Sequence, residues 1–184
     1  MSFVLKGDRL NVEYHENFLP HELATNLFNY ILTYMPWKKK SGKESILLGD
    51  EGLTYEVSYR GKDMSKSTIP WHYHPFLHAV KEHLENFTKK RYTYCIIQRY
   101  PSKVGIGMHR DKEMQPGSII AGISLGASRT FTFQPSYYVK TQATSLELKH
   151  GSLYLINPPT NDYWAHQIEK QDGIRVSLTF RTVV

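Results

Sequence analysis

The sequence has one cysteine in 184 residues, Cys95, so no disulfide can form within the chain. Disulfides are rare in reducing compartments, and we expect an intracellular protein, nuclear or cytoplasmic, in which Cys95 is a buried apolar residue. No apolar run approaches the roughly 20 residues that a membrane-spanning helix needs, and no segment has the pattern of a signal peptide. We therefore expect no membrane-spanning segment.

Acidic residues are fewer than basic ones. The chain has 17 Asp and Glu against 23 Lys and Arg, a net charge of +6 at pH 7. Such a surface favours polyanions, so nucleic acid and an acidic membrane face are candidate partners. Internal repeats and compositional linkers are also missing, and 40% of the residues are hydrophobic. These features predict a single domain over residues 1–184, and we expect a monomer.

The spacing of apolar residues predicts an α+β chain that is mainly β. In segments 20–35 and 75–90, apolar residues recur at helical spacing. After residue 91, short β-prone runs alternate with Gly and Pro turns, which is typical of a sandwich or jelly roll. We expect N-terminal helices within 1–91 and a jelly-roll core over 92–184. The expected strands are 4–5, 10–14, 53–59, 92–100, 119–125, 130–133, 145–148, 152–156 and 175–181.

The segment Met108–Glu113 contains a candidate metal-binding pair, His109 and Asp111. Side chains two positions apart on a strand lie on the same face, so both can bind one ion. His166 offers a third ligand, and two His with one carboxylate form the facial triad of non-heme Fe(II) oxygenases. A His-x-Asp pair alone is a weak signal; the glycine-rich turn 104–107 and the later His166 strengthen it. We expect the other histidines to be surface, packing or turn residues.

The last predicted strand, 175–181, has one polar and one apolar face. Arg175, Ser177, Thr179 and Arg181 alternate with three apolar residues, so they share a face. Burying two cations is costly without anions, and Arg binds carboxylates in a bidentate manner. A dicarboxylate satisfies both arginines, with Tyr100 as a further donor. The alternative is an edge strand whose polar face is solvated.

A series of motifs then occurs in a familiar order: His109-Arg110-Asp111-Lys112-Glu113, segment 116–126, Arg129-x-Phe131-x-Phe133, segment 150–153, Asn157-x-Pro159-Thr160-Asn161, Trp164-x-His166 and segment 175–181. Over residues 47–184, and most densely from residue 98, they resemble the AlkB family of Fe(II)/2-oxoglutarate-dependent nucleic-acid dealkylating dioxygenases. The segment Gly49-Asp50-x-Gly52-Leu53-Thr54-Tyr55 is similar to the eukaryotic-type homologues that repair DNA.

The resemblance implies a double-stranded β-helix, or jelly roll, under an N-terminal nucleotide-recognition lid. It implies that Fe(II) is held by His109, Asp111 and His166. It implies that 2-oxoglutarate is held by Gln98, Tyr100, Arg175, Ser177, Thr179 and Arg181. It implies three substrate-binding residues. Tyr55 helps to hold the damaged base, Arg110 lies at the mouth of the site, and Glu113 lies near the base edge.

Several positions depart from the family pattern. Gln98 stands where the homologues carry Asn, and its longer amide can still donate a hydrogen bond. Val57 stands where DNA-repairing relatives place a second aromatic residue, and Gly42-Lys43 and Leu48 replace their Pro-Arg and Tyr. These departures affect the choice of substrate more than the metal and cosubstrate sets.

The implied function is oxidative demethylation of N-alkylated bases in DNA or RNA, such as 1-methyladenine and 3-methylcytosine. The reaction couples 2-oxoglutarate and O2 to succinate, CO2 and formaldehyde, and no membrane partner is expected. Basic residues are available for phosphates: Lys38, Lys39, Lys40, Lys43, Arg60, Lys62 and Lys66. The basic loop 38–43 also fits a solvated surface loop. The alternatives are a hydroxylase or demethylase of a protein or small molecule, and a non-catalytic nucleic-acid-binding module.

Overall fold

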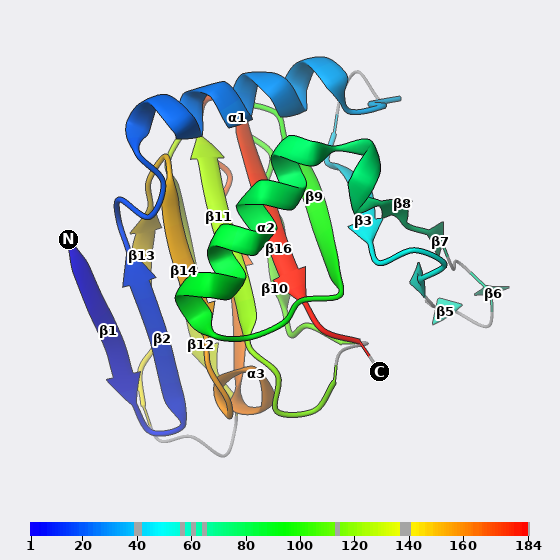
Figure 1. Cartoon of the computed structure of the whole chain (residues 1–184). Coiled ribbons are helices and arrows are strands. Elements are labelled where there is room, and N and C mark those ends of the chain that lie inside the picture. Colours follow the sequence, from blue (N-terminus) through cyan, green and yellow to red (C-terminus); the bar gives the residue numbers. More distant parts are fainter. Residues whose placement is uncertain are drawn as a thin grey trace.

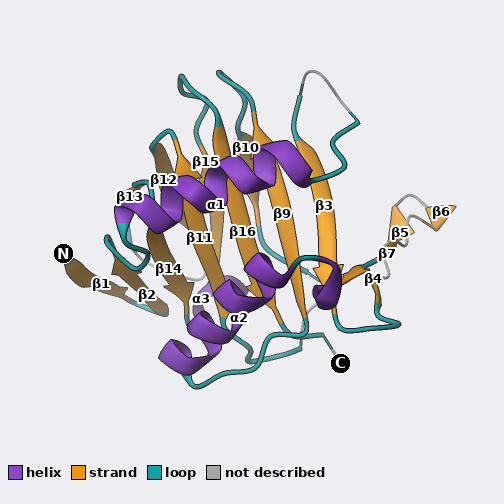
Figure 2. Cartoon of the chain, turned by 45° about the horizontal axis from the view of Figure 1, so that its top comes forward, coloured by secondary structure: helices purple, strands orange, loops and turns teal. Residues whose placement is uncertain are grey.

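The computed structural model describes residues 1–38, 42–55, 58–59, 62–63, 66–112, 115–136 and 141–183, and no side chain from 55 to 65. Two β-sheets face each other, and the two long helices α1 (His21–Tyr34) and α2 (Pro75–Thr88) cover the outer face of the larger sheet (Figures 1 and 2). This arrangement is the jelly roll predicted from the sequence.

The larger sheet has the strand order β1-β2-β14-β11-β16-β9-β3-β8. Neighbouring strands are antiparallel, except that β3 and β8 are parallel. The strands are β1 (Ser2–Gly7), β2 (Leu10–His15), β3 (Glu44–Gly49), β8 (Ile69–Pro70), β9 (Tyr94–Tyr100), β11 (Ile120–Gly126), β14 (Ser152–Ile156) and β16 (Arg175–Arg181). Strands from both ends of the sequence therefore build one sheet.

The smaller sheet has the order β10-β15-β12-β13. Its strands are β10 (Ile106–His109), β12 (Arg129–Pro135), β13 (Thr144–Leu148) and β15 (Trp164–Ile168). The remaining elements are β4 (Thr54–Tyr55), β5 (Ser58–Tyr59), β6 (Lys62–Asp63), β7 (Lys66–Ser67), the 3-10 helix η1 (Trp71–Tyr73) and α3 (Thr160–Tyr163). No helix in the described part of the chain is long and apolar enough to cross a membrane.

The larger sheet has an apolar core on each of its faces. On the helix side, Leu27 and Ile31 of α1 pack with Val176 and Leu178 of β16. On the other side, residues of β2, β11 and β14 pack with residues of the smaller sheet, among them Phe131, Phe133 and Trp164. Strand β16 therefore directs alternate side chains to different interiors, and its polar set points between the two sheets.

The predicted helices and most predicted strands are confirmed within a few residues. Cys95 is buried, as expected, and burial raises the pKa of its thiol. Strands β3, β10 and β15 were not predicted, because they are short and carry polar or glycine residues within the apolar pattern. The expected strand 53–59 is described only at β4 and β5, and residues 56 and 57 lie outside the described part of the chain.

Helix α1 provides a test of the helix-side core. Leu27 is fully buried, whereas Leu23 on the same helix is 38% exposed. We expect Leu27→Ala to lower the free energy of unfolding by about 3 kcal/mol, because a buried Leu leaves a cavity. Leu23→Ala should cost less than about 1 kcal/mol. Urea unfolding followed by circular dichroism measures both, and equal losses would contradict this packing.

Candidate active site

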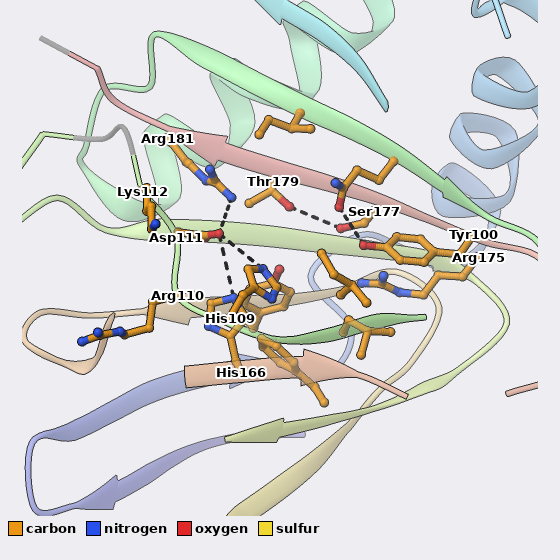
Figure 3. A pocket seen from close by; sticks show the side chains of 16 residues that line it. Tyr100, His109, Arg110, Asp111, Lys112, His166, Arg175, Ser177, Thr179 and Arg181 are labelled. Atoms are coloured by element: carbon orange, nitrogen blue, oxygen red, sulfur yellow. Dashed lines mark hydrogen bonds and ion pairs between the residues drawn. The ribbon is translucent and has the colours of Figure 1, made fainter. Parts of the chain in front are cut away.

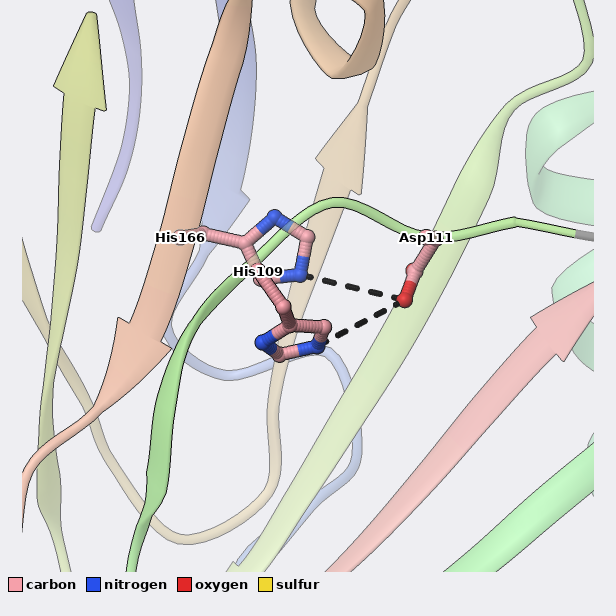
Figure 4. A group of neighbouring side chains, drawn as sticks. All are labelled: His109, Asp111 and His166. Atoms are coloured by element: carbon pink, nitrogen blue, oxygen red, sulfur yellow. Dashed lines mark ion pairs between the residues drawn. The ribbon is translucent and has the colours of Figure 1, made fainter. Parts of the chain in front are cut away.

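Three potential metal ligands meet between the two sheets. His109 ends β10 and pairs in register with His166 of β15, and Asp111 follows two residues later. Their ligand atoms all lie within 4.8 Å of one another. Asp111 Oδ1 is 3.7 Å from His109 Nε2 and 3.9 Å from His166 Nε2 (Figure 4). Two imidazoles and one carboxylate on one side of an ion leave other positions open, which suits Fe(II).

The position of Asp111 differs from the expectation that it shares a strand with His109. Strand β10 ends at His109, so strand alternation does not place the carboxylate. Asn161 of α3 holds the Asp111 backbone instead: the Asp111 N–H donates to Asn161 Oδ1 at 3.0 Å, and Asn161 Nδ2 donates to the Asp111 carbonyl oxygen at 2.9 Å. This double hydrogen bond fixes the segment beyond the strand.

The two imidazoles present nitrogen atoms suited to a metal. Burial lowers the pKa of His166 to about 4, against the opposing effect of Asp111, so the ring is neutral at pH 7 and keeps a free lone pair. His109 Nδ1 lies 2.8 Å from the Gly107 carbonyl oxygen. Because a carbonyl only accepts, Nδ1 carries the proton and Nε2 is left to face Asp111.

Arg181 lies at the metal end of the pocket. Its Nη2 atom is 2.7 Å from Asp111 Oδ1, and both side chains are less than a tenth exposed. The sequence predicted that Arg181 would face a cosubstrate; the structure places it on the carboxylate of the candidate metal site. Arg181 therefore fixes the Asp111 carboxylate and lies beside any group that binds next to the metal.

Arg175 lies at the other end of the same pocket, whose volume is about 250 Å³ (Figure 3). Its side chain is almost fully buried. Its Nε atom donates to Ser124 Oγ at 2.8 Å, while Nη1 and Nη2 have no hydrogen-bond partner among the described residues. Buried charged donors are costly unless an anion meets them.

Strand β16 lies between β11 and β9, so the edge-strand alternative is wrong.

Tyr100 and Gln98 of β9 contact each other at the Arg175 end. Tyr100 donates its hydroxyl hydrogen to Gln98 Oε1 at 2.7 Å, and Gln98 Nε2 donates to Ser45 Oγ at 3.3 Å. Burial raises the pKa of Tyr100 to about 12, so the phenol stays protonated. The Gln98 amide, expected to donate to a cosubstrate, is directed to β3 and orients Tyr100 instead.

Of the three predicted substrate residues, only the side chain of Arg110 is described. It lies at the rim of the pocket, where Nη1 donates to the Asp162 carbonyl oxygen at 2.6 Å. Glu113 and the side chain of Tyr55 lie outside the described residues, as do Lys39, Lys40, Arg60 and the side chain of Lys62.

Three described lysines remain from the predicted basic set. Lys38 and Lys66 are exposed. Lys43 is partly buried, and this burial lowers the pKa of its amine, whereas Asp111 raises it. Lys43 is therefore close enough to interact with the charge at the metal end of the pocket.

Sequence reasoning assigned no role to three residues of the site. Asn161 was noted only as part of a motif, Phe131 as part of another, and Tyr154 as an ordinary strand residue. Phe131 packs with its ring centroid 5.4 Å from that of His166, and Tyr154 lines the pocket. The signal for Tyr154 was one phenol among the apolar residues 153–156, which is too little to identify it in advance.

The chain is similar to known proteins over most of its length. The model of the 2OG-Fe(II) oxygenase superfamily matches residues 11–181. Human "DNA oxidative demethylase ALKBH2" is 33% identical over 175 residues, 89% of this chain and 64% of that protein. The mouse protein of the same name is 32% identical, covering 89% of this chain and 70% of its own length.

Human "Alpha-ketoglutarate-dependent dioxygenase alkB homolog 3" is 30% identical, over 81% of this chain and 58% of that protein. The chain thus spans roughly two thirds of the length of the curated relatives it matches. The solved structure of OsALKBH1 superposes with a TM-score of 0.62 at 16% identity, over 97% of this chain and 99% of that one. That likeness supports the fold alone.

The two hydrogen bonds between Asn161 and the Asp111 backbone can be tested through metal binding. We expect Asn161→Ala to weaken Mn(II) binding about 10-fold, because residues that orient a ligand typically contribute 10–100-fold to metal affinity. Asn26→Ala, on the exposed face of α1, is the control and should leave affinity unchanged. Calorimetric titration measures the Mn(II) affinity of both variants. Wild-type affinity in Asn161→Ala would show that metal binding does not need the hydrogen bonds of Asn161.

The two arginines should have separable effects. We expect Arg175→Met to weaken 2-oxoglutarate binding by at least 30-fold while Mn(II) affinity stays within about 2-fold, because this side chain is remote from the triad. Arg181→Met should weaken both ligands, since Arg181 contacts Asp111. If Arg175→Met weakened the binding of both Mn(II) and 2-oxoglutarate, that result would contradict the placement of the two arginines at opposite ends of the pocket.

Proposed function

This chain belongs to the 2OG-Fe(II) oxygenase superfamily and, within it, to the AlkB family, and we propose that it oxidatively removes N-methyl groups from bases of DNA or RNA. Its cofactors are Fe(II) and 2-oxoglutarate. One observation carries the proposal: the candidate iron ligands and the unpartnered Nη atoms of Arg175 line the same pocket. A dicarboxylate with a 2-oxo group can bind the metal through its 2-oxo end and Arg175 through its other carboxylate.

The donor set fits both groups. When bound, Fe(II) supplies the oxidation, in which 2-oxoglutarate and O2 become succinate and CO2 and the methyl carbon leaves as formaldehyde. His109, Asp111 and His166 hold the metal, and Arg175 pairs with the distal carboxylate of 2-oxoglutarate. Arg181 holds the Asp111 carboxylate in place.

The pocket walls support this chemistry by limiting water. Phe131 and Ile168 line the pocket beside His166, and Ile96 lines it beside Thr179. In such surroundings, charge pairs are stronger than in water, and fixed ligands place the methyl group within reach of the reacting centre.

A base must leave its stack to reach this site, which favours single-stranded nucleic acid or a flipped nucleotide. The net charge of +6 favours binding to the phosphate backbone. Arg110 and Lys112 line the pocket and are exposed, which supports a role for both in binding phosphates. The roles of Tyr55 and Glu113 toward the base remain predictions.

The identity of the polymer is part of the proposal. Relatives from human and mouse are named DNA oxidative demethylases, which supports DNA as the substrate. We propose 1-methyladenine and 3-methylcytosine as the bases. The single cysteine supports action in a reducing compartment, nuclear or cytoplasmic, and we propose a monomer.

A repair assay tests the function. The protein is incubated with Fe(II), 2-oxoglutarate, O2 and an oligonucleotide carrying 1-methyladenine, and mass spectrometry measures adenine. We expect restored adenine and one formaldehyde per base. Asp111→Ala should reduce the rate at least 100-fold by removing a metal ligand, while His72→Ala, at an exposed histidine of η1, should retain it.

Two results would contradict the proposal. Turnover of 2-oxoglutarate without repair of DNA or RNA would favour a hydroxylase or demethylase of a protein or small molecule. Binding of the oligonucleotide without any metal-dependent turnover would favour a non-catalytic module.

A further inference from the structure

Tyr154 is a buried polar residue of the pocket that the triad and the arginine face leave without a role. It lies on β14 and is 6% exposed. In the sheet register, Tyr154 pairs with Gly122 of β11, and Gly122 pairs with Thr179 of β16. The three residues form one row across three strands, with Gly122 between a phenol and a hydroxyl of the cosubstrate face.

Gly122 leaves the space that the Tyr154 ring occupies. A Cβ atom at position 122 would lie 2.0 Å from Tyr154 Cζ and 2.3 Å from its hydroxyl oxygen. Any other amino acid would therefore displace the ring. The ring lies over β11 at Gly122 and brings its hydroxyl toward Thr179 of β16.

The Tyr154 hydroxyl is a hydrogen-bond donor near Arg175. Burial raises the pKa of the phenol, and the Arg175 guanidinium is the main opposing influence, so the group is protonated. Thr179 Oγ1 lies 3.3 Å from Ser177 Oγ. Three hydroxyls therefore lie at this wall of the pocket, and the hydrogen bond between Ser177 and Thr179 leaves two of their three protons for further acceptors.

The other phenol of the pocket is already engaged. Tyr100 donates to Gln98 Oε1, and Arg175 Nε donates to Ser124. Among the described residues, the donors that remain near the Arg175 end are its two Nη atoms and two protons from the hydroxyls of Ser177, Thr179 and Tyr154. A carboxylate has about four acceptor sites and can receive all of them.

We propose that Tyr154, admitted by Gly122, donates a hydrogen bond to the distal carboxylate of 2-oxoglutarate and helps to select a dicarboxylate over a shorter 2-oxo acid. This inference rests on the proposed function only in taking 2-oxoglutarate as the molecule paired with Arg175. Tyr154 is a specificity-determining residue, and the ligands of the metal do not depend on it.

Binding measurements without O2 test the inference independently of catalysis. Isothermal titration of the Mn(II)-loaded protein compares 2-oxoglutarate with 2-oxobutyrate, which lacks the distal carboxylate. We expect Tyr154→Phe to weaken 2-oxoglutarate binding about 10-fold, as for the loss of one hydrogen bond to a charged group. The affinity for 2-oxobutyrate should change less than 2-fold.

Tyr92→Phe is the matched control. Tyr92 is also buried, and its hydroxyl donates to Thr88 at 3.3 Å, but it packs in the helix-side core. This variant removes a buried phenol hydroxyl outside the pocket, so both affinities should equal those of the wild type. Mn(II) titration of each variant shows whether the metal site has folded.

Gly122→Ala supplies a second, independent variant. It keeps the hydroxyl but displaces the ring, so it should also weaken 2-oxoglutarate binding. The double variant Gly122→Ala/Tyr154→Phe should bind about as weakly as Gly122→Ala alone, because the hydroxyl has already left its position. Additive losses would overturn the link between the two residues.

The outcomes separate the inference from the proposed function. If the wild-type protein does not bind 2-oxoglutarate, the proposed function fails. If the wild-type protein binds it and Tyr154→Phe binds it equally well, the inference alone is overturned. An equal loss for both acids would also overturn it, because Tyr154 would then only shape the pocket.

Discussion

The pocket depends on how anions balance the positive charges of two buried guanidinium groups, those of Arg175 and Arg181. Arg175 and Arg181 lie on a central strand, and both are buried. Such charges are costly unless they are paired. Arg181 pairs with Asp111 at 2.7 Å and so ties the larger sheet to the metal ligands. Arg175 has no such carboxylate among the described residues, and its two Nη atoms remain available. Arg181 thus orients the candidate metal site, and Arg175 is the cation that we propose binds the cosubstrate.

The jelly roll makes this arrangement possible because its two sheets bring different chemistry to one interior. The smaller sheet supplies His109 and His166, which are paired across β10 and β15. The larger sheet supplies the alternating polar side chains of β16, while their apolar neighbours pack against the helices. The row formed by Tyr154, Gly122 and Thr179 extends the polar face across two further strands. The absence of a side chain at position 122 therefore shapes the pocket, because it leaves room for the Tyr154 ring.

Much of the fold could be predicted from the sequence, because local patterns determine it, and the residues of the candidate iron triad were identified from the order of the motifs. Helical spacing located α1 and α2, and period-two alternation located β16 and both of its faces. The remaining features depend on contacts that no local pattern reports. Asn161 and Asp111 are 50 positions apart, and the use of the Gln98 amide depends on Ser45 across the sheet. Strands β10 and β15 were missed because the polar residues that make them functional interrupt their apolar pattern.

The central claim is that one 2-oxo dicarboxylate spans from Arg175 to the metal. If so, metal and 2-oxoglutarate must bind cooperatively, and each must raise the affinity of the other by the same factor. Calorimetric titration of 2-oxoglutarate with and without Mn(II), and of Mn(II) with and without 2-oxoglutarate, measures that factor without any turnover. We expect at least a 10-fold increase in affinity in both directions. Equal 2-oxoglutarate affinity in the presence and absence of the metal would show that the two ends of the pocket do not share one ligand.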